Sequence, residues 1–209
     1  QAAKWYQKAI KYGDHEARCE LGCLLVSGEE PDIEAGRKWL EEAVQINHSQ
    51  KAAWYLAMSY LRDSDPNMSV KAAAWLEKTI ALEPEDSKKA SVFKNDALTW
   101  LGICCARGEE LAAKDVERAR ALLEEAAQNG YAKAQFVLGQ YYHNGEYGLP
   151  KDQLKGLQYI KEAAEQGDAD AQYMLGCIYE FGDGVEQNGE TAWNWYVKSA
   201  KQMQKEACT

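Results

Sequence analysis

Small and large apolar residues recur along the chain with the spacing of one face of an α-helix. In the clearest copy, Leu175 and Tyr179 lie four residues apart and share a face, while Gly176 lets a second helix approach closely. Gly182 follows as a residue that ends the helix. The pattern occurs five times, and its small central residues are Gly22, Ala57, Gly102, Gly139 and Gly176, at intervals of 35, 45, 37 and 37 residues. A period of this length predicts a repeat protein built from helical hairpins.

A second pattern alternates with the first, with a small residue, two adjacent bulky residues and another small residue on one face. Its six copies begin at Ala2, Gly36, Ala72, Ala119, Gly156 and Ala192. Because six second helices face five first helices, residues 1–15 are expected to be the second helix of an incomplete repeat. The apolar face around Trp5 would then lack one neighbour and could associate with a second copy of the chain.

Glycines mark the boundaries between hairpins. Gly13, Gly130 and Gly167 each follow a second helix, where a glycine can take a positive φ. One junction is irregular, because Pro84 and neighbouring charges interrupt the period, and we expect a partly helical connector over 83–95. The chain is thus predicted to be one solenoid domain, 1–209, with successive repeats at 16–50, 51–95, 96–132, 133–169 and 170–209.

Composition narrows the classes of partner. The chain has 209 residues, of which 46% are hydrophobic and 27% charged, so a folded core is expected rather than disorder. Its formal net charge of -9 disfavours binding to the phosphates of a nucleic acid. Its apolar runs are short pieces such as Cys23 to Val26, far below the roughly 20 residues of a membrane-spanning helix, and we expect no membrane span.

The cysteines suggest a cellular compartment. Cys19 and Cys23 are four residues apart on a predicted helix, a placement that suits a disulfide poorly, and Cys104 and Cys105 are adjacent. No cysteine spacing is shared between the repeats, as a framework of stapling bridges would require. We therefore expect reduced thiols and a cytoplasmic protein. If a removed signal peptide preceded Gln1, the protein is periplasmic or secreted instead.

The repeat also resembles a known family. The run Ala171 to Gly182, the Lys-Asp pairs that precede two second helices, and the segment Ala192 to Ala200 are similar to the Sel1-like repeat (SLR), a branch of the tetratricopeptide superfamily. The second repeat departs most, since Ala57 replaces the glycine and Asp63 replaces the loop glycine. The resemblance implies an all-α solenoid of stacked antiparallel helix pairs that form a right-handed superhelix, with the first helices lining the concave side.

Positions that the repeat pattern leaves unspecified are the candidates for binding. Residues three before and one after the central small residue, with some a turn further on, are expected to face the concavity. They are Cys19, Cys23, Trp54, Met58, Leu61, Thr99, Ile103, Phe136, Gln140, His143, Tyr173, Cys177 and Glu180. Apolar surface of this kind marks an interaction site. The alternative is that successive first helices contact one another, which would make Ile103 and the cysteines part of the core.

Other candidate chemistry is weaker. His15, His48 and His143 lie in different repeats without metal-ligand spacing, so we expect no metal site. Carboxylate pairs such as Glu124-Glu125 fit a solvated helix face better than acid–base catalysis. Cys104-Cys105 has no base nearby in the sequence, which argues against a nucleophile. We therefore expect no enzymatic activity and no cofactor.

Two functions from different classes remain. The first is a non-catalytic scaffold that binds a protein or peptide in its concave groove, and the acidic charge would suit a basic partner. The resemblance implies adaptor, regulatory or toxin-neutralising immunity-type roles. The second is a cell-wall or β-lactam-type ligand binder or hydrolase, as in cysteine-rich relatives. The resemblance to those relatives implies a cysteine pair in each hairpin. The corresponding second-helix positions of this chain instead include Ala43, Ala126 and Ala163.

Overall fold

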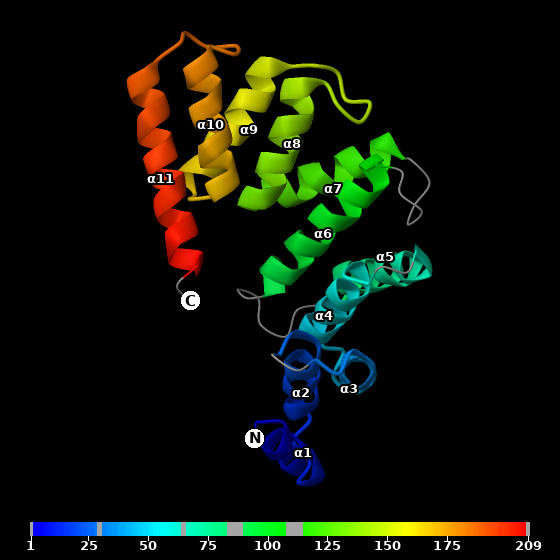
Figure 1. Cartoon of the computed structure of the whole chain (residues 1–209). Coiled ribbons are helices and arrows are strands. Elements are labelled where there is room, and N and C mark those ends of the chain that lie inside the picture. Colours follow the sequence, from blue (N-terminus) through cyan, green and yellow to red (C-terminus); the bar gives the residue numbers. More distant parts are fainter. Residues whose placement is uncertain (1, 29–30, 64–65, 83–89, 108–114, 208–209) are drawn as a thin grey trace. The chain divides into compact units, whose positions relative to one another are not determined.

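The structure, a computed structural model, describes residues 2–28, 31–63, 66–82, 90–107 and 115–207 (Figure 1). These residues form α-helices joined by short loops, and no strand occurs among them. The chain divides into two compact units, Gln1–Lys114 (unit 1) and Asp115–Thr209 (unit 2). Unit 1 holds α1 Ala2–Lys11, α2 Glu16–Ser27, α3 Ile33–Asn47, α4 Gln50–Leu61, α5 Pro66–Ala81 and α6 Ala90–Arg107. Unit 2 holds α7 Val116–Gln128, α8 Ala132–Asn144, α9 Gln153–Glu165, α10 Ala169–Phe181 and α11 Gly189–Ala207.

The helices are the predicted first and second helices of an all-α solenoid. Within unit 1, α2 packs on α3 and α4 packs on α5, and the first helices α2, α4 and α6 contact one another in order. Within unit 2, α8 packs on α9 and α10 packs on α11, while α9 also contacts α10. Each hairpin therefore shares its buried face with the next, as the repeat pattern predicts. The extent of one solenoid domain over 1–209, the repeat boundaries and the right-handed superhelix stay predictions.

Local signals in the sequence explain where the helices begin. Asp32, Asp115 and Asp152 are the N-caps of α3, α7 and α9, and each carboxylate accepts a hydrogen bond from the backbone N–H three residues later, at 3.1, 2.9 and 3.0 Å. An aspartate in this place satisfies a backbone donor that has no partner within the helix. The Lys-Asp pairs that precede α7 and α9 thus supply the aspartate that begins each helix, whereas Asp32 follows a proline.

The predicted small residues allow the helices of a hairpin to touch. A Cβ added at Gly156 in α9 would lie 2.5 Å from the backbone nitrogen of His143 and 2.7 Å from the carbonyl oxygen of Gly139, both in α8. A Cβ at Gly176 in α10 would lie 2.6 Å from the ring of Tyr196 in α11. Real Cβ atoms do not approach so closely, so these positions accept only glycine without movement of a neighbour. The boundary glycines Gly130 and Gly167 have the expected positive φ, 78° and 97°.

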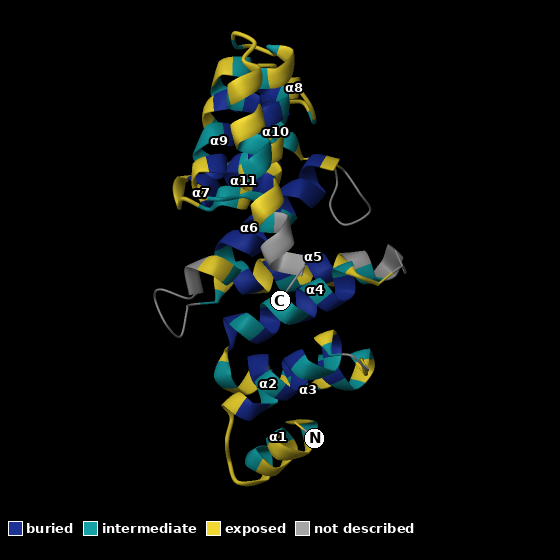
Figure 2. Ribbon diagram, turned by 60° about the vertical axis from the view of Figure 1, so that its left-hand side comes forward, coloured by how far each residue is buried: buried dark blue, intermediate teal, exposed yellow. Residues whose placement is uncertain are grey.

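The cores consist of the bulky positions of the pattern. In unit 1, Leu21, Leu40, Leu56 and Leu76 are fully buried, and in unit 2 the same holds for Leu123, Leu138 and Ile160, while Leu175 is 1% exposed. Burial of each such side chain stabilises the fold by about 1.5 to 3 kcal/mol. Figure 2 shows these buried stripes on the inner faces of the hairpins.

The two ends of unit 1 differ from the regular hairpin. Residues 83–89 of the predicted connector lie outside the described residues, whereas α6 begins at Ala90 and includes the remainder of the range. At the other end, α1 has no fully buried residue, and Trp5 is 68% exposed. Ala9 and Ile10 are half-buried, and α1 packs only on α2 among the described helices. Association of two copies through this face stays a prediction.

Buried glutamines make a connection that the sequence pattern did not predict. The side-chain amide of Gln135 donates to the carbonyl of Ala127 at 3.4 Å, and that of Gln172 donates to the carbonyl of Ala164 at 3.0 Å. Each glutamine belongs to a first helix and donates to a carbonyl near the end of the preceding second helix, which also accepts from the N–H of the boundary glycine. These hydrogen bonds connect each first helix of unit 2 to the second helix before it.

Candidate functional site

A hollow on the first-helix face of unit 2 collects several of the predicted binding residues. It has a volume of about 410 Å³ and lies between α8 and α10. Its lining residues are Phe136, Gln140, Asp170, Tyr173, Met174 and Cys177. We call this hollow the α8–α10 groove. The volume falls in the range of about 300 to 1,000 Å³ that is typical of ligand sites in proteins.

The floor of the α8–α10 groove is anchored in the core. Phe136 and Met174 are half-buried and pack against the buried cluster that contains Leu175 and Ile178. Tyr173 stands above them with 55% of its surface exposed. A large aromatic side chain in this position can add contact area when a partner docks, because Phe136 and Met174 already exclude water from the floor beneath it.

A side chain from α11 holds one wall of the groove in place. The rings of Tyr173 and Tyr196 lie 5.4 Å apart. The hydroxyl of Tyr196 donates to Glu180 Oε2 at 2.5 Å and lies 3.4 Å from Cys177 Sγ. Burial, with these two acceptors, raises the pKa of Tyr196, so its hydroxyl stays protonated and keeps donating. Three predicted residues of α10 are therefore connected through one tyrosine.

His143 does not line the α8–α10 groove. It is 3% exposed, and its Nε2 lies 2.9 Å from Asp183 Oδ2, in the loop between α10 and α11. Gln153 donates to the other oxygen of Asp183 at 2.7 Å. The hydrogen bond with His143 lowers the pKa of Asp183. The expectation that His143 faces a partner is thus corrected, because this side chain fastens the loop to α8.

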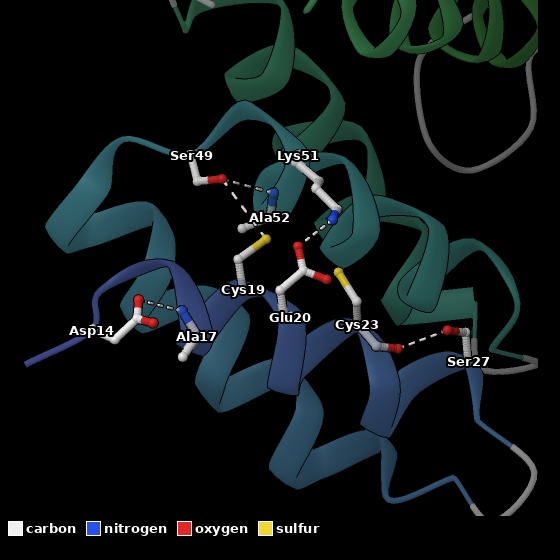
Figure 3. A network of polar contacts seen from close by, with 9 residues as sticks. All are labelled: Asp14, Ala17, Cys19, Glu20, Cys23, Ser27, Ser49, Lys51 and Ala52. Carbon is white, nitrogen blue, oxygen red and sulfur yellow. Dashed lines mark hydrogen bonds and ion pairs between the residues drawn. The ribbon is translucent and has the colours of Figure 1, made fainter. Parts of the chain in front are cut away.

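In the first repeat, the predicted cysteines lie among a group of polar side chains from α2 and the start of α4 (Figure 3). Cys19 and Cys23 are 6% and 7% exposed. The hydroxyl of Ser49 lies 3.8 Å from Cys19 Sγ, and Lys51 forms an ion pair with Glu20 at 2.6 Å beside the two thiols. The hydrogen bond between the thiols lowers the pKa of Cys19 and raises that of Cys23. These two residues are core here, which is the alternative reading of the stripe.

The second repeat uses Trp54 for packing between helices. Its indole N–H donates to Asp96 Oδ2 at 2.8 Å, and its ring lies 5.4 Å from that of Phe93. Both partners lie on α6, so this half-buried side chain joins α4 to α6. On α6 itself, Thr99 is fully buried and donates to the carbonyl of Asn95 at 2.7 Å. Thr99 therefore offers nothing to a partner, which corrects its place among the binding residues.

A second hollow lies within unit 1, on the same face of its first helices. It has a volume of about 370 Å³ and lies between α4 and α6. We call it the α4–α6 groove, and its lining residues are Met58, Leu61, Arg62, Trp100, Ile103, Cys104 and Arg107. Met58 and Leu61 are half-buried, whereas Ile103 is 7% exposed and forms part of the floor. Binding of a partner by Met58 and Leu61 stays a prediction.

Sequence reasoning missed the charged members of both grooves. Arg62 follows Met58 by four residues, Arg107 follows Ile103 by four, and Asp170 precedes Tyr173 by three. These are helical neighbours of residues in the predicted stripe, so extending the stripe by one turn in each direction would have found them. The spacing of these charged residues was visible in the sequence, but the repeat pattern identifies only positions near the centre of each helix.

The arrangement is suited to binding. Among the described residues, no group of three or more His, Cys, Asp or Glu side chains is placed to hold a metal ion. Within the same ranges, the structure contains no helix whose length and hydrophobicity would let it cross a bilayer. The described cysteines form no disulfide with one another; they are Cys19, Cys23, Cys104, Cys105 and Cys177. What both grooves offer is apolar surface flanked by charge.

Comparison with solved structures shows the same fold in other proteins. A Sel1 repeat protein from Oxalobacter formigenes matches with a TM-score of 0.75 at 24% identity, over 94% of this chain and 75% of that one. The immunity proteins Pa5087 and PA5088 from Pseudomonas aeruginosa match with TM-scores of 0.58 and 0.59 at 18% and 20% identity. Both matches cover 95% of this chain, and 72% and 73% of the respective immunity proteins.

The family assignment rests on the repeats themselves. A comparison with curated proteins found none similar to this chain. The Sel1 repeat, in contrast, matches at residues 1–14, 15–48, 50–83, 95–131, 132–168 and 169–202, which together make up most of the sequence. The chain therefore belongs to the Sel1 repeat family.

Proposed function

We propose that the chain is a non-catalytic scaffold that binds a segment of a protein partner in the α8–α10 groove. The observation that carries the proposal is the exposed ring of Tyr173, 55% accessible, above a floor of Phe136 and Met174. Large aromatic side chains at the centre of an apolar hollow contribute most of the binding energy in protein interfaces. The repeat fold supports the same role, since proteins built as solenoids present extended surfaces to partners.

The charge near this groove favours a basic partner. Asp170 lines the groove and Glu180 lies one turn beyond Cys177 on the same helix, and both side chains are exposed. The whole chain carries a formal net charge of -9, which attracts a positively charged protein at long range. A lysine or arginine of the partner can lay its aliphatic stem on the tyrosine ring and direct its charge to Asp170.

The biological role that follows is an adaptor, a regulatory subunit or a toxin-neutralising immunity protein. The last role is supported by two proteins with this fold, Pa5087 and PA5088, which are immunity proteins. A secreted toxin with a basic surface would fit the acidic scaffold. The three roles share one mechanism, because each needs a segment of another protein to be held in the groove.

The test is a comparison of two exposed aromatic residues. Tyr173 lines the groove, whereas Trp193 is 67% exposed on α11 and does not line it. Partners captured by the wild-type chain are identified by mass spectrometry, and the affinity of each purified partner is then measured calorimetrically. Tyr173→Ala should weaken binding by about 2 kcal/mol, or roughly 30-fold, while Trp193→Ala leaves it unchanged.

Two outcomes contradict the proposal. Equal affinity of wild type and Tyr173→Ala for every partner would place binding elsewhere on the chain. Turnover of a chromogenic β-lactam, abolished by Tyr173→Ala or another groove substitution, would favour the ligand-binding or hydrolytic alternative. Thermal denaturation of each variant serves as the control for folding.

A further inference from the structure

The α4–α6 groove has the opposite charge to the α8–α10 groove. Of the seven lining residues that the structure describes, two are arginines, Arg62 and Arg107, and none of these seven is acidic. This is a local exception on a chain in which 33 acidic residues outnumber 24 basic ones. The electrostatic preference of the hollow is therefore set by its rim and differs from that of the chain as a whole.

Between the arginines lies an apolar floor. Ile103 and Cys104 are 7% and 3% exposed, and Met58, Leu61 and Trp100 are half-buried around them. The floor is held by the contact between α4 and α6, which includes the hydrogen bond from Trp54 to Asp96. A hollow of about 370 Å³ with this lining fits one large apolar side chain with part of its flanking backbone.

Arg62 is available to a partner. Its side chain is exposed and makes no ion pair or hydrogen bond among the described residues. The neighbouring carboxylate of Asp63 instead accepts from Arg37 at 3.1 Å. The carboxylate of Asp96 accepts from Trp54. The acidic residue next to Arg62 in the sequence is thus engaged by Arg37, and the exposed Arg62 lines an apolar hollow.

We propose that the α4–α6 groove binds a protein segment in which a large apolar side chain stands next to a carboxylate. The apolar side chain fills the hollow over Ile103, and the carboxylate pairs with Arg62. A guanidinium matches a carboxylate with two parallel hydrogen bonds, which makes arginine more selective for this group than lysine is. The choice of a protein segment rests on the proposed scaffold function.

The two grooves then recognise segments of opposite charge. The α8–α10 groove, flanked by Asp170 and Glu180, takes a basic segment, and the α4–α6 groove takes an acidic one. A uniformly basic segment is disfavoured by the α4–α6 groove, because the arginines of this groove repel positive charge.

The experiment begins with a displayed library of random twelve-residue peptides, selected on the intact wild-type chain. Peptides are sorted by whether they still bind the Arg62→Gln, Met58→Ala and Tyr173→Ala variants. We expect peptides that depend on both Arg62 and Met58 to carry Asp or Glu beside Leu, Ile, Phe, Met or Trp. Peptides that depend on Tyr173 form a separate set and report on the proposed function independently.

Synthetic copies of the Arg62-dependent peptides give the quantitative test by fluorescence anisotropy. Arg62→Gln should weaken binding about tenfold, and binding should fall as salt is raised. Lys38→Gln removes the same charge from an exposed position on α3 and should change the affinity less than twofold, since screening reduces distant charges. Circular dichroism melting curves confirm that each variant is folded.

Several results overturn the inference. The first is that no selected peptide depends on both Arg62 and Met58. The second is that the Arg62-dependent peptides carry no carboxylate. The third is that acidic peptides bind the Arg62→Gln variant as tightly as they bind the wild-type chain. Displacement of the acidic peptides by decanoate at a tenth of their concentration would identify a fatty-acid site instead. If the selection yields Arg62-dependent peptides but none that depend on Tyr173, the proposed function of the α8–α10 groove is refuted and the proposal for the α4–α6 groove is retained.

Discussion

The close contact between α8 and α9 at Gly156 provides a quantitative test of the repeat packing. Gly156 in α9 faces α8, where an added Cβ would lie 2.5 Å from the nitrogen of His143, 2.7 Å from the carbonyl oxygen of Gly139 and 2.8 Å from the Cα of His143. All three atoms belong to the backbone of α8. The substitution Gly156→Ala therefore cannot be accommodated by rotation of a side chain, and α8 and α9 must separate.

Two opposing effects determine the size of the change. Forcing extra volume into a packed contact costs about 1 to 3 kcal/mol, and the upper value applies here because only backbone atoms can move. Alanine in a helix interior is favoured over glycine by about 1 kcal/mol, which offsets part of the cost. The free energy of unfolding should fall by about 2 kcal/mol, and for a chain of this size that lowers the melting temperature by about 4 to 8 °C.

The assay is thermal and urea unfolding followed by circular dichroism. Gly189→Ala is the matched control, since Gly189 begins α11 and a Cβ there meets no atom within 4 Å. The control should be neutral or slightly stabilising. A melting temperature for Gly156→Ala equal to or above that of wild type would show that α8 and α9 are not in the close contact on which the fold is built.

Three further predictions concern individual side chains. Trp54→Phe keeps an aromatic side chain, although a smaller one, and removes the indole N–H that donates to Asp96, a carboxylate 8% exposed. The free energy of unfolding should therefore fall by about 1 to 3 kcal/mol, and an unchanged urea midpoint would contradict the role of Trp54 in joining α4 to α6. Because Asp183 has a lowered pKa in the folded protein, its contribution to stability is present above the ordinary aspartate pKa and is lost as the pH falls through the lowered value. Asp183→Asn should therefore melt below wild type at pH 7, and the two curves should converge as the pH falls below about 4; a gap that does not narrow would refute the pairing with His143. In a Cys208→Ser background, maleimide should modify Cys177 faster than Cys19, Cys23, Cys104 and Cys105, because Cys177 is half-buried and the others are buried, and mass spectrometry of digested protein over time would reveal any other order.

The sequence predicted the helix pairs because their signals are local. Leu138 and Ile160 carry the 3.6-residue period of their helices, Asp152 caps a helix within three residues of its own position, and Gly167 ends a repeat through its own φ. Each of these features depends on neighbours along the chain. They recur in several copies of the repeat, so one copy helps to interpret another.

The tertiary structure decided which variable positions face solvent. Thr99 and Tyr173 occupy the same place in the repeat, three residues before the central glycine, yet one is fully buried and the other is 55% exposed. Burial depends on the side chains that arrive from other helices, and these differ from repeat to repeat. The same reason separates His143, which turns to Asp183, from Glu180, which stays at the surface.

By itself, the sequence determined that this is an all-α solenoid of Sel1 repeats and identified the first-helix face as the variable one. Only the tertiary structure showed that the first helices form two hollows whose described lining residues differ in charge. Arg62, at the end of α4, and Arg107, on α6, line one hollow, whereas Asp170 on α10 lines the other together with residues of α8. Periodicity places residues on a helix face, whereas a groove exists only where two such faces meet. The candidate site is therefore a property of helix packing, built from residues that the repeat leaves free to vary.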